Sequence, residues 1–394
     1  MLFRSLLLWA GVCLVMVGCG SSPQRAHDNG VDWLVTNQNE DGTWGTFASA
    51  RPWEVTLGTQ ASHDGFGMAT SALATLALHE PSKTDPTAFE AMVKGLDHLL
   101  TQQTPGRATG GIFYDTWAHT YMLQCVAVLY RDERLADRVP QMAEVIEREI
   151  DILADRQAAD GGWCYYDFGH SRVTPTGMLS TSFNTAAVLI AFEQARRSGF
   201  DAPADVVHDA LAALARLRFP SGGYAYSFAH RNSPQGRANK IQGSIGRSQV
   251  CNLALYLYNQ GVTLEDLERG VEQMRTWHHY ILIGKGRPIP HEGWYATAGY
   301  YFMFGHYYAG LAIEELPDGP RQDHARWLAQ TLRELQDEGD SWFDFPVYGY
   351  GRSYATAFGV LALQAAERAM SPNPVRNSLV VDAQDRPTNA RTTQ

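Results

Sequence analysis

Two kinds of segment alternate along the chain. In residues 85–103, 138–157, 204–219, 263–283 and 321–336, charged and apolar residues are mixed at helical spacing. Apolar residues that recur every three or four positions indicate an α-helix with one buried face. Residues 71–78, 185–192 and 356–363 are instead rich in Ala, Ser, Thr and Leu and are apolar on nearly every side. A helix that is apolar all round has to be buried, so the pattern predicts outer helices that cover inner ones.

The buried segments repeat. Looser copies start at Met122, Ser248 and Thr297, so the six copies begin at residues 71, 122, 185, 248, 297 and 356. Three of them follow a clear turn in which a Gln precedes Gly and Trp, at residues 38–44, 157–163 and 336–342. Glycine readily adopts the positive φ that ends a helix. Six helix pairs close naturally into a ring, so the predicted fold is all-α, an (α/α)6 toroid that forms one domain over residues 26–370.

The Gln…Gly-x-Trp turn followed by a Thr-Ala-x-x-x-Leu-Ala-Leu helix resembles the repeat of the prenyltransferase and squalene-oxidase superfamily. Triterpene cyclases, protein prenyltransferases and complement-type thioester domains are members of it. The resemblance covers about residues 26–370 and implies a ligand cavity at the end where the inner helices begin. The Asp-x-Asp-Asp acid motif of the cyclases and the Gly-Cys-Gly-Glu-Gln motif of the thioester domains are both absent. The resemblance therefore implies the fold but not an activity.

A metal site has one weak candidate. Cys164, Asp167 and His170 are spaced as Cys-x-x-Asp-x-x-His, and thiolate, carboxylate and imidazole all bind zinc. The zinc ligands of the prenyltransferases are not one local triplet, so a polar turn between helices is the favoured interpretation. We therefore predict neither a metal nor another cofactor.

Two carboxylates are candidates for acid–base chemistry in the cavity. Asp64 and Asp115 each lie seven residues before a repeat start, with His63 and His119 close by in the sequence. Carboxylates on adjacent inner helices could share a proton or act as an acid–base pair. The alternative is that each Asp caps the start of its helix.

Aromatic residues are dense in the last two repeats, at residues 294–308 and 342–354. Some of them must be core packing, but a tyrosine-rich cavity mouth would suit an apolar or a sugar ligand. The candidate ligand-binding residues are Trp117, Tyr300, His306, Tyr350, Arg352 and Tyr354.

The N-terminus is predicted to be a processing signal. Arg4 is followed by an apolar run over residues 6–17, which is typical of a signal peptide. The sequence Met-Val-Gly-Cys at 16–19 resembles a bacterial lipobox, so residues 1–18 would be removed and Cys19 lipidated. Residues 19–25 would be a tether, and residues 371–394 a disordered tail. These features predict a lipid-anchored protein of the bacterial cell envelope, at the outer membrane or the periplasmic face, with the membrane as a partner.

Charge narrows the choice of partners. The chain has 32 Lys and Arg against 42 Asp and Glu, a net charge of −10, which disfavours nucleic acid as a partner. The leading hypothesis is an envelope toroid whose cavity binds an apolar, glycan or protein ligand. The alternative is an enzyme, either a divergent terpenoid cyclase or transferase or a toroid similar to the polysaccharide lyases. An apolar cavity would favour a lipid or terpene, a wide polar groove a glycan, and a filled centre an interaction scaffold.

Overall fold

In the computed structural model, residues 22–48, 60–105, 114–164 and 180–372 are described. Within these ranges the regular structure is entirely helical, apart from two isolated β-bridges. The outer helices are α1 (Pro23–Thr36), α3 (Pro86–Thr101), α5 (Val139–Asp155), α7 (Ala204–Leu217), α9 (Leu264–Thr276) and α12 (Pro320–Leu335). The inner helices are α2 (Gln60–Ala77), α4 (Thr116–Leu129), α6 (Ser182–Arg197), α8 (Ile241–Leu257), α11 (Phe302–Glu314) and α13 (Gly351–Met370).

Shorter helical pieces lie between the long helices. Two of them matter below, namely α10 (His278–Leu282) and the 3-10 turn η6 (Gly299–Tyr301). The remaining 3-10 turns are η2 (Pro81–Lys83), η3 (Glu133–Arg138), η4 (Phe228–Asn232) and η5 (Arg237–Asn239).

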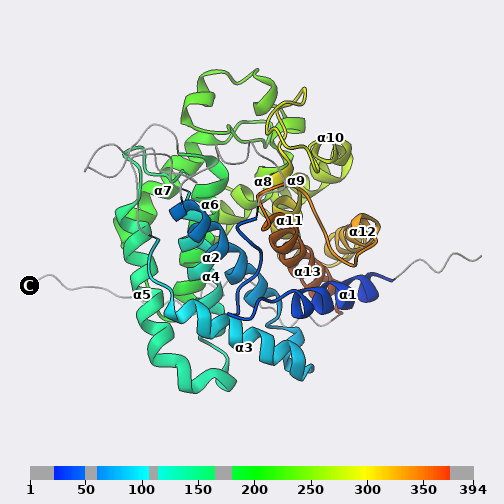
Figure 1. Ribbon diagram of the computed structural model, residues 1–394. Coiled ribbons are helices and arrows are strands. Elements are labelled where there is room, and N and C mark those ends of the chain that lie inside the picture. Colours follow the sequence, from blue (N-terminus) through cyan, green and yellow to red (C-terminus); the bar gives the residue numbers. More distant parts are fainter. Residues whose placement is uncertain (1–21, 49–59, 106–113, 165–179, 373–394) are drawn as a thin grey trace, which may run out of the picture.

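The inner helices form a closed ring. Along the ring, α2 packs on α4, α4 on α6, α6 on α8, α8 on α11 and α11 on α13, and α13 packs back on α2. Helix α1 lies against α13, so the two ends of the toroid meet (Figure 1). The predicted (α/α)6 toroid is confirmed.

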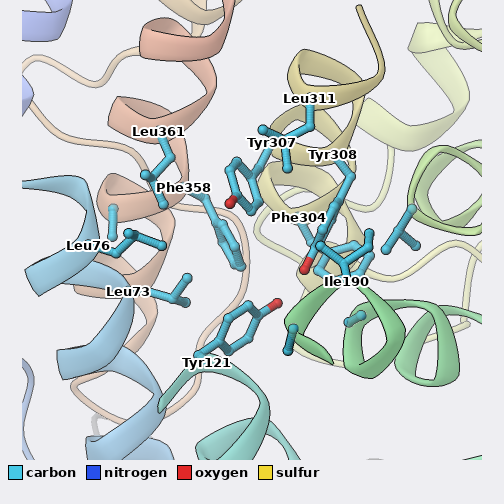
Figure 2. Packing of buried hydrophobic residues seen from close by; sticks show 14 of the residues in the cluster. Leu73, Leu76, Tyr121, Ile190, Phe304, Tyr307, Tyr308, Leu311, Phe358 and Leu361 are labelled. Carbon is cyan, nitrogen blue, oxygen red and sulfur yellow. The ribbon is translucent and has the colours of Figure 1, made fainter. Parts of the chain in front are cut away.

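Part of the ring centre, toward the C-terminal ends of the inner helices, is filled by side chains. Figure 2 shows Leu76 of α2, Ile190 of α6, Tyr307 of α11 and Leu361 of α13 converging there. All four are buried. The Tyr307 hydroxyl accepts a hydrogen bond of 2.9 Å from the Gln124 side chain, which satisfies a polar group inside an otherwise apolar core.

The sequence repeat has a specific structural cause at the turns. Trp44, Trp163 and Trp342 are fully buried, and each indole N–H donates to a leucine carbonyl ten residues earlier, at 2.7, 2.7 and 2.9 Å. The backbone N–H of each tryptophan donates to a hydroxyl on the next inner helix, at distances of 3.0 to 3.1 Å. These hydroxyls belong to Ser71, Thr185 and Thr356, the first residues of the three clearest repeats.

The recurring spacing of the three turn glutamines also has a structural cause. The Gln157 amide donates to Gly161 O within its own turn and to Val206 O of the next outer helix, at 2.9 and 2.7 Å. Gln38 makes the two equivalent bonds, to Gly42 O of its own turn and to Ala91 O of α3. Gln336 closes the ring by donating to Ala26 O of α1 at 2.8 Å. Each glutamine therefore joins two neighbouring repeats.

The N-terminal boundary differs from the predicted one. Helix α1 already begins at Pro23, inside the predicted tether, because the Ser22 hydroxyl accepts from Arg25 N and proline suits the first helical position. The predicted signal segment, Cys19 and the tail beyond residue 372 lie outside the described residues. No helix in the described part of the chain is both long and apolar enough to cross a bilayer.

Candidate functional site

A cavity of about 320 Å³ lies between the inner helices, next to the filled part of the ring centre. Helices α2, α4, α6, α11 and α13 supply its walls, and Tyr114 and the segments 290–300 and 345–350 supply the rest. Leu73, Tyr121, Phe304 and Phe358, which converge in Figure 2, form part of the wall. The lining residues are Phe66, Ala69, Thr70, Leu73, Tyr114, Trp117, Tyr121, Phe183, Pro290, His291, Tyr300, Phe304, Phe345, Val347, Tyr350, Tyr354 and Phe358.

Four of the candidate ligand-binding residues line this cavity, namely Trp117, Tyr300, Tyr350 and Tyr354. Trp117 stacks on Tyr121 with a ring-centroid distance of 5.6 Å, so it is part of an aromatic wall. The cavity lies toward the N-terminal ends of the inner helices, because Trp117 and Tyr354 belong to the first turns of α4 and α13. This is the end at which the family resemblance implies a ligand cavity.

The two other candidates, Arg352 and His306, do not line the cavity. Arg352 is exposed, and its guanidinium donates to Asp337 at 2.8 Å and to Ser341 Oγ at 2.7 Å. His306 is fully buried against α10, with its Nε2 atom 2.9 Å from Nε2 of His278. Helix rotation thus directs one side chain toward the surface and the other toward the outer layer.

The structure does not bring Asp64 and Asp115 together in the cavity. Asp115 is fully buried, where it pairs with Arg156, and its Oδ2 atom lies 3.6 Å from His119 Nε2. His119 Nδ1 in turn lies 2.5 Å from Glu149 of α5, so this charge cluster occupies the space between α4 and α5. Asp64 is exposed. Asp115 holds the N-cap position of α4, but its side chain makes no capping hydrogen bond.

His63 lies near the cavity mouth but is not part of the lining. Its buried imidazole packs between the rings of Phe47 and Tyr348, at centroid distances of 3.9 and 4.0 Å. Burial lowers the pKa of His63, although the charge of Asp64 opposes this. The ring acts as an aromatic packing group here.

The weak zinc candidate is tested only in part. Cys164 is half-buried, whereas Asp167 and His170 lie outside the described residues. In the ranges that are described, no group of three His, Cys, Asp or Glu side chains is arranged to hold a metal ion.

Sequence reasoning missed a buried carboxyl group, Asp344. The Tyr354 hydroxyl donates to its Oδ1 atom at 2.5 Å, and the Met303 backbone N–H donates to Oδ2 at 2.9 Å. Burial raises the pKa of Asp344 to about 7, against the opposing effect of these hydrogen bonds. The available signal was one acidic residue inside the apolar run at 342–347.

Sequence reasoning also missed His291, whose imidazole contacts the Tyr300 hydroxyl. Its Nδ1 atom is 2.8 Å from Ala296 O, and its Nε2 atom is 3.0 Å from the Tyr300 hydroxyl. A ring nitrogen facing a carbonyl must carry the proton, so Nε2 accepts from Tyr300. Burial lowers the pKa of His291, which favours this neutral form.

Backbone strain is concentrated at the cavity mouth. His291, Ala296 and Tyr348 adopt positive φ angles of 64°, 53° and 46°, which residues other than glycine rarely do. Strained residues of this kind often accompany functional sites, because the surrounding structure has to hold them in place. The strain therefore agrees with the cavity being the functional site.

Three solved structures illustrate what this fold is similar to. The α-1,6-mannanase of Salegentibacter sp. has a TM-score of 0.54 at 12% identity and covers 88% of this chain and 100% of its own. The cellobiose 2-epimerase of Spirochaeta thermophila has a TM-score of 0.53 at 16% identity, with 87% and 95% covered. A type II terpene cyclase from Scytonema has a TM-score of 0.47 at 15% identity, with 88% and 99% covered.

No protein-family model matches the sequence, and neither does any curated protein. Similarity at these low identities shows the fold alone. Together with the closed ring of inner helices, it shows that the chain belongs to the α/α toroids.

Proposed function

We propose that this toroid binds an apolar ligand in its aromatic cavity. The observation that carries the proposal is the chemistry of the lining. Among the described lining residues, eleven of seventeen are Phe, Tyr or Trp, and none is Asp, Glu, Lys or Arg. Burial of apolar surface would drive binding in such a site, and polar groups would serve only to orient the ligand.

The size of the cavity limits the ligand. A volume of 320 Å³ is at the small end of ordinary ligand sites. At about 30 Å³ per water-sized group it accommodates roughly ten to fifteen non-hydrogen atoms. A branched C10 hydrocarbon therefore fits the cavity better than a long acyl chain does.

A glycan is the less favoured ligand. The mannanase and the epimerase are named for sugars, but a sugar ring presents many hydroxyl groups that need polar partners. Glycoside hydrolysis further requires two carboxyl groups beside the scissile bond. Neither Asp64 nor Asp115 lines the cavity, and the described lining residues include no pair of carboxyl groups.

We also propose that the protein is anchored at the cell envelope through Cys19. The lipobox-like sequence at 16–19 and the apolar run before it support this. Acyl chains on one cysteine would hold the toroid at a membrane surface through burial of their CH2 groups. Mass spectrometry of the mature protein tests it, since a mass that begins at an acylated Cys19 is expected and an intact Met1 terminus would contradict it.

Calorimetric titration with 2,6-dimethylocta-2,6-diene, a branched C10 hydrocarbon, tests the binding proposal. We expect micromolar binding that is lost in Ala69→Trp, because the new indole fills the cavity from α2. Ala204→Trp is the matched control, since Ala204 is exposed on α7. If Ala69→Trp does not fold, Val347→Trp blocks the cavity from a loop instead. Binding that survives in a folded, blocked variant, or tighter binding of cellobiose than of the diene, would overturn the proposal.

A further inference from the structure

The apolar cavity has one polar corner. Tyr300 of η6 and Tyr354 of α13 both line the cavity. The Tyr300 hydroxyl is hydrogen-bonded to His291, which also lines the cavity, and the Tyr354 hydroxyl to Asp344, which does not. The ring of Tyr300 packs on Phe345 at a centroid distance of 5.5 Å, and Phe345 directly follows Asp344, the partner of Tyr354. The two tyrosines therefore belong to one site.

The partners of the two phenols fix the direction of their hydrogen bonds. Tyr300 donates to Nε2 of His291, because Ala296 O holds the only proton of the neutral imidazole on Nδ1. Tyr354 donates to the Asp344 carboxylate, whose second oxygen is held by Met303 N–H. A phenol that has given its single proton to a partner can act toward a ligand only as an acceptor.

The Asp344 carboxyl group adds a second state to this corner. When Asp344 is protonated, its O–H donates to the Tyr354 oxygen, and the Tyr354 proton turns toward the cavity. The corner then offers one acceptor, from Tyr300, and one donor, from Tyr354. A hydroxyl group on a ligand both donates and accepts, so it satisfies both tyrosines in this state and bonds either of them in the other.

Other polar head groups fit less well. A carboxylate or a diphosphate carries charge that would need a cation or several N–H donors, and the described lining residues include no Lys or Arg. An ether or a plain alkene offers no donor. Away from this corner the wall is mostly carbon, so the apolar skeleton of the ligand would lie there.

The corner is also rigid. His291 and Ala296 hold their positive φ angles on the segment that carries the imidazole. Gly299 begins η6 directly against Asp344, where a Cβ atom would come within 2.4 Å of the Asp344 carbonyl oxygen. Side chains that are held before binding lose little freedom on contact with a ligand, which makes a single hydrogen-bonded group selective.

From these contacts we propose that the ligand is an alcohol, an apolar skeleton with one hydroxyl group held between Tyr300 and Tyr354. The inference depends on the proposed apolar binding site and names the chemical class that the site selects. His291 and Asp344 are positioning residues, because they act on the ligand through the two phenols.

The test compares geraniol with 2,6-dimethylocta-2,6-diene, which is the same skeleton without the hydroxyl group. We expect the wild-type protein to bind geraniol at least 10-fold more tightly than the diene by calorimetric titration. Tyr300→Phe and Tyr354→Phe should each reduce this preference several-fold and the double variant should abolish it, while affinity for the diene stays unchanged. Tyr130→Phe is the matched control, because that ring packs on Phe200 at the other end of α4.

The outcomes separate this inference from the proposed function. If neither compound binds, the apolar site itself is wrong, and the inference fails with it. If both bind but geraniol has no advantage, or keeps its advantage in the folded double variant, the alcohol inference is overturned and the apolar site stands. Geranyl methyl ether provides a second check, because it can accept from Tyr354 but cannot donate to Tyr300, so it should bind more weakly than geraniol.

Discussion

At the scale of single residues, burial is the main influence on the protonation of His306 and His278. His306 is fully buried, and its Nδ1–H donates to Phe302 O at 2.6 Å. Its Nε2 atom must therefore accept from Nε2–H of His278, which lies 2.9 Å away. Burial and the neighbouring imidazole lower the pKa of His306 to about 3, and burial lowers that of His278 to about 4.

This pair predicts a loss of stability in mild acid. The unfolded chain binds protons at these histidines near pH 6.5, whereas the folded chain resists protonation down to pH 3 to 4. Stability from the pair is thus complete above pH 6.5 and falls as the pH drops below it, by up to about 1.4 kcal/mol per pH unit for each histidine. Denaturant unfolding at pH 7, 6 and 5 measures this slope.

Substitution assigns the slope to the pair. His306→Phe should flatten the pH dependence of the free energy of unfolding. It removes one buried titratable imidazole, and it also removes that imidazole from the surroundings of His278. His208→Phe is the control, because His208 is exposed on α7 and its removal should leave the slope unchanged. An equal slope in His306→Phe and the wild type would show that other groups control the acid response.

At the scale of helices and turns, neighbouring repeats are joined through side-chain amides. Gln336 is the most informative of the three glutamines, because it links the last outer helix, α12, to the first, α1. Its Nε2 atom donates to Ala26 O at 2.8 Å and to Asp340 O at 3.2 Å. These bonds contribute to closing the ring where the two ends of the toroid meet.

Gln336→Met keeps the length of the side chain and removes its donors. We expect the free energy of unfolding to fall by about 1–3 kcal/mol, because two backbone carbonyl groups lose a partner in a half-buried place. Gln330→Met on the same helix is the control, since Gln330 is exposed and should change stability by less than about 0.5 kcal/mol. Equal effects in guanidinium unfolding would remove Gln336 from the ring closure.

The helices and turns were the most predictable level of this structure. Inner and outer helices differ in periodicity, and Ser71, Thr185 and Thr356 recur because each accepts a hydrogen bond from a turn tryptophan. Such local contacts leave a regular trace in the sequence. The toroid fold that the resemblance implied followed from them and was confirmed.

The site was less predictable, because it depends on how each inner helix is rotated and on irregular loops. Spacing placed Asp64 and Asp115 at equivalent positions, yet one faces solvent and the other faces Arg156. Asp344 and His291 come from loop segments that carry no period, so only the folded chain brings them to Tyr354 and Tyr300. Counting aromatic residues found the cavity wall but not its polar corner.

At the scale of the whole molecule, the start of α1 is set back from the cavity mouth. His27 of α1 lies 3.3 Å from the side chain of Gln364, near the C-terminal end of α13, whereas the cavity lies at the N-terminal end of that helix. Helix α1 has 14 residues and is about 21 Å long. An anchor at Cys19, four residues before α1, would therefore hold the start of this helix near the membrane.

This geometry predicts that the cavity mouth of the anchored protein points away from the membrane. Two variants, each with one added cysteine, test it in a Cys164→Ser background, where the remaining described cysteines, Cys125 and Cys251, are buried. Gln24→Cys lies at the start of α1, and Gln235→Cys lies in the exposed connection before α8, at the mouth end. With the lipidated protein in vesicles, a membrane-impermeant maleimide should label Gln235→Cys as fast as in detergent. It should label Gln24→Cys several-fold more slowly.

The reverse pattern would mean that the mouth faces the bilayer, so that a ligand enters directly from lipid. The expected pattern has a different consequence for function. A mouth that faces the aqueous compartment must take its ligand from solution or from a carrier protein. A C10 alcohol is soluble enough to arrive without a carrier, whereas a longer hydrocarbon is not. The orientation and the preference for geraniol therefore support each other, and agreement between the two experiments would connect the polar corner to the way in which the ligand arrives.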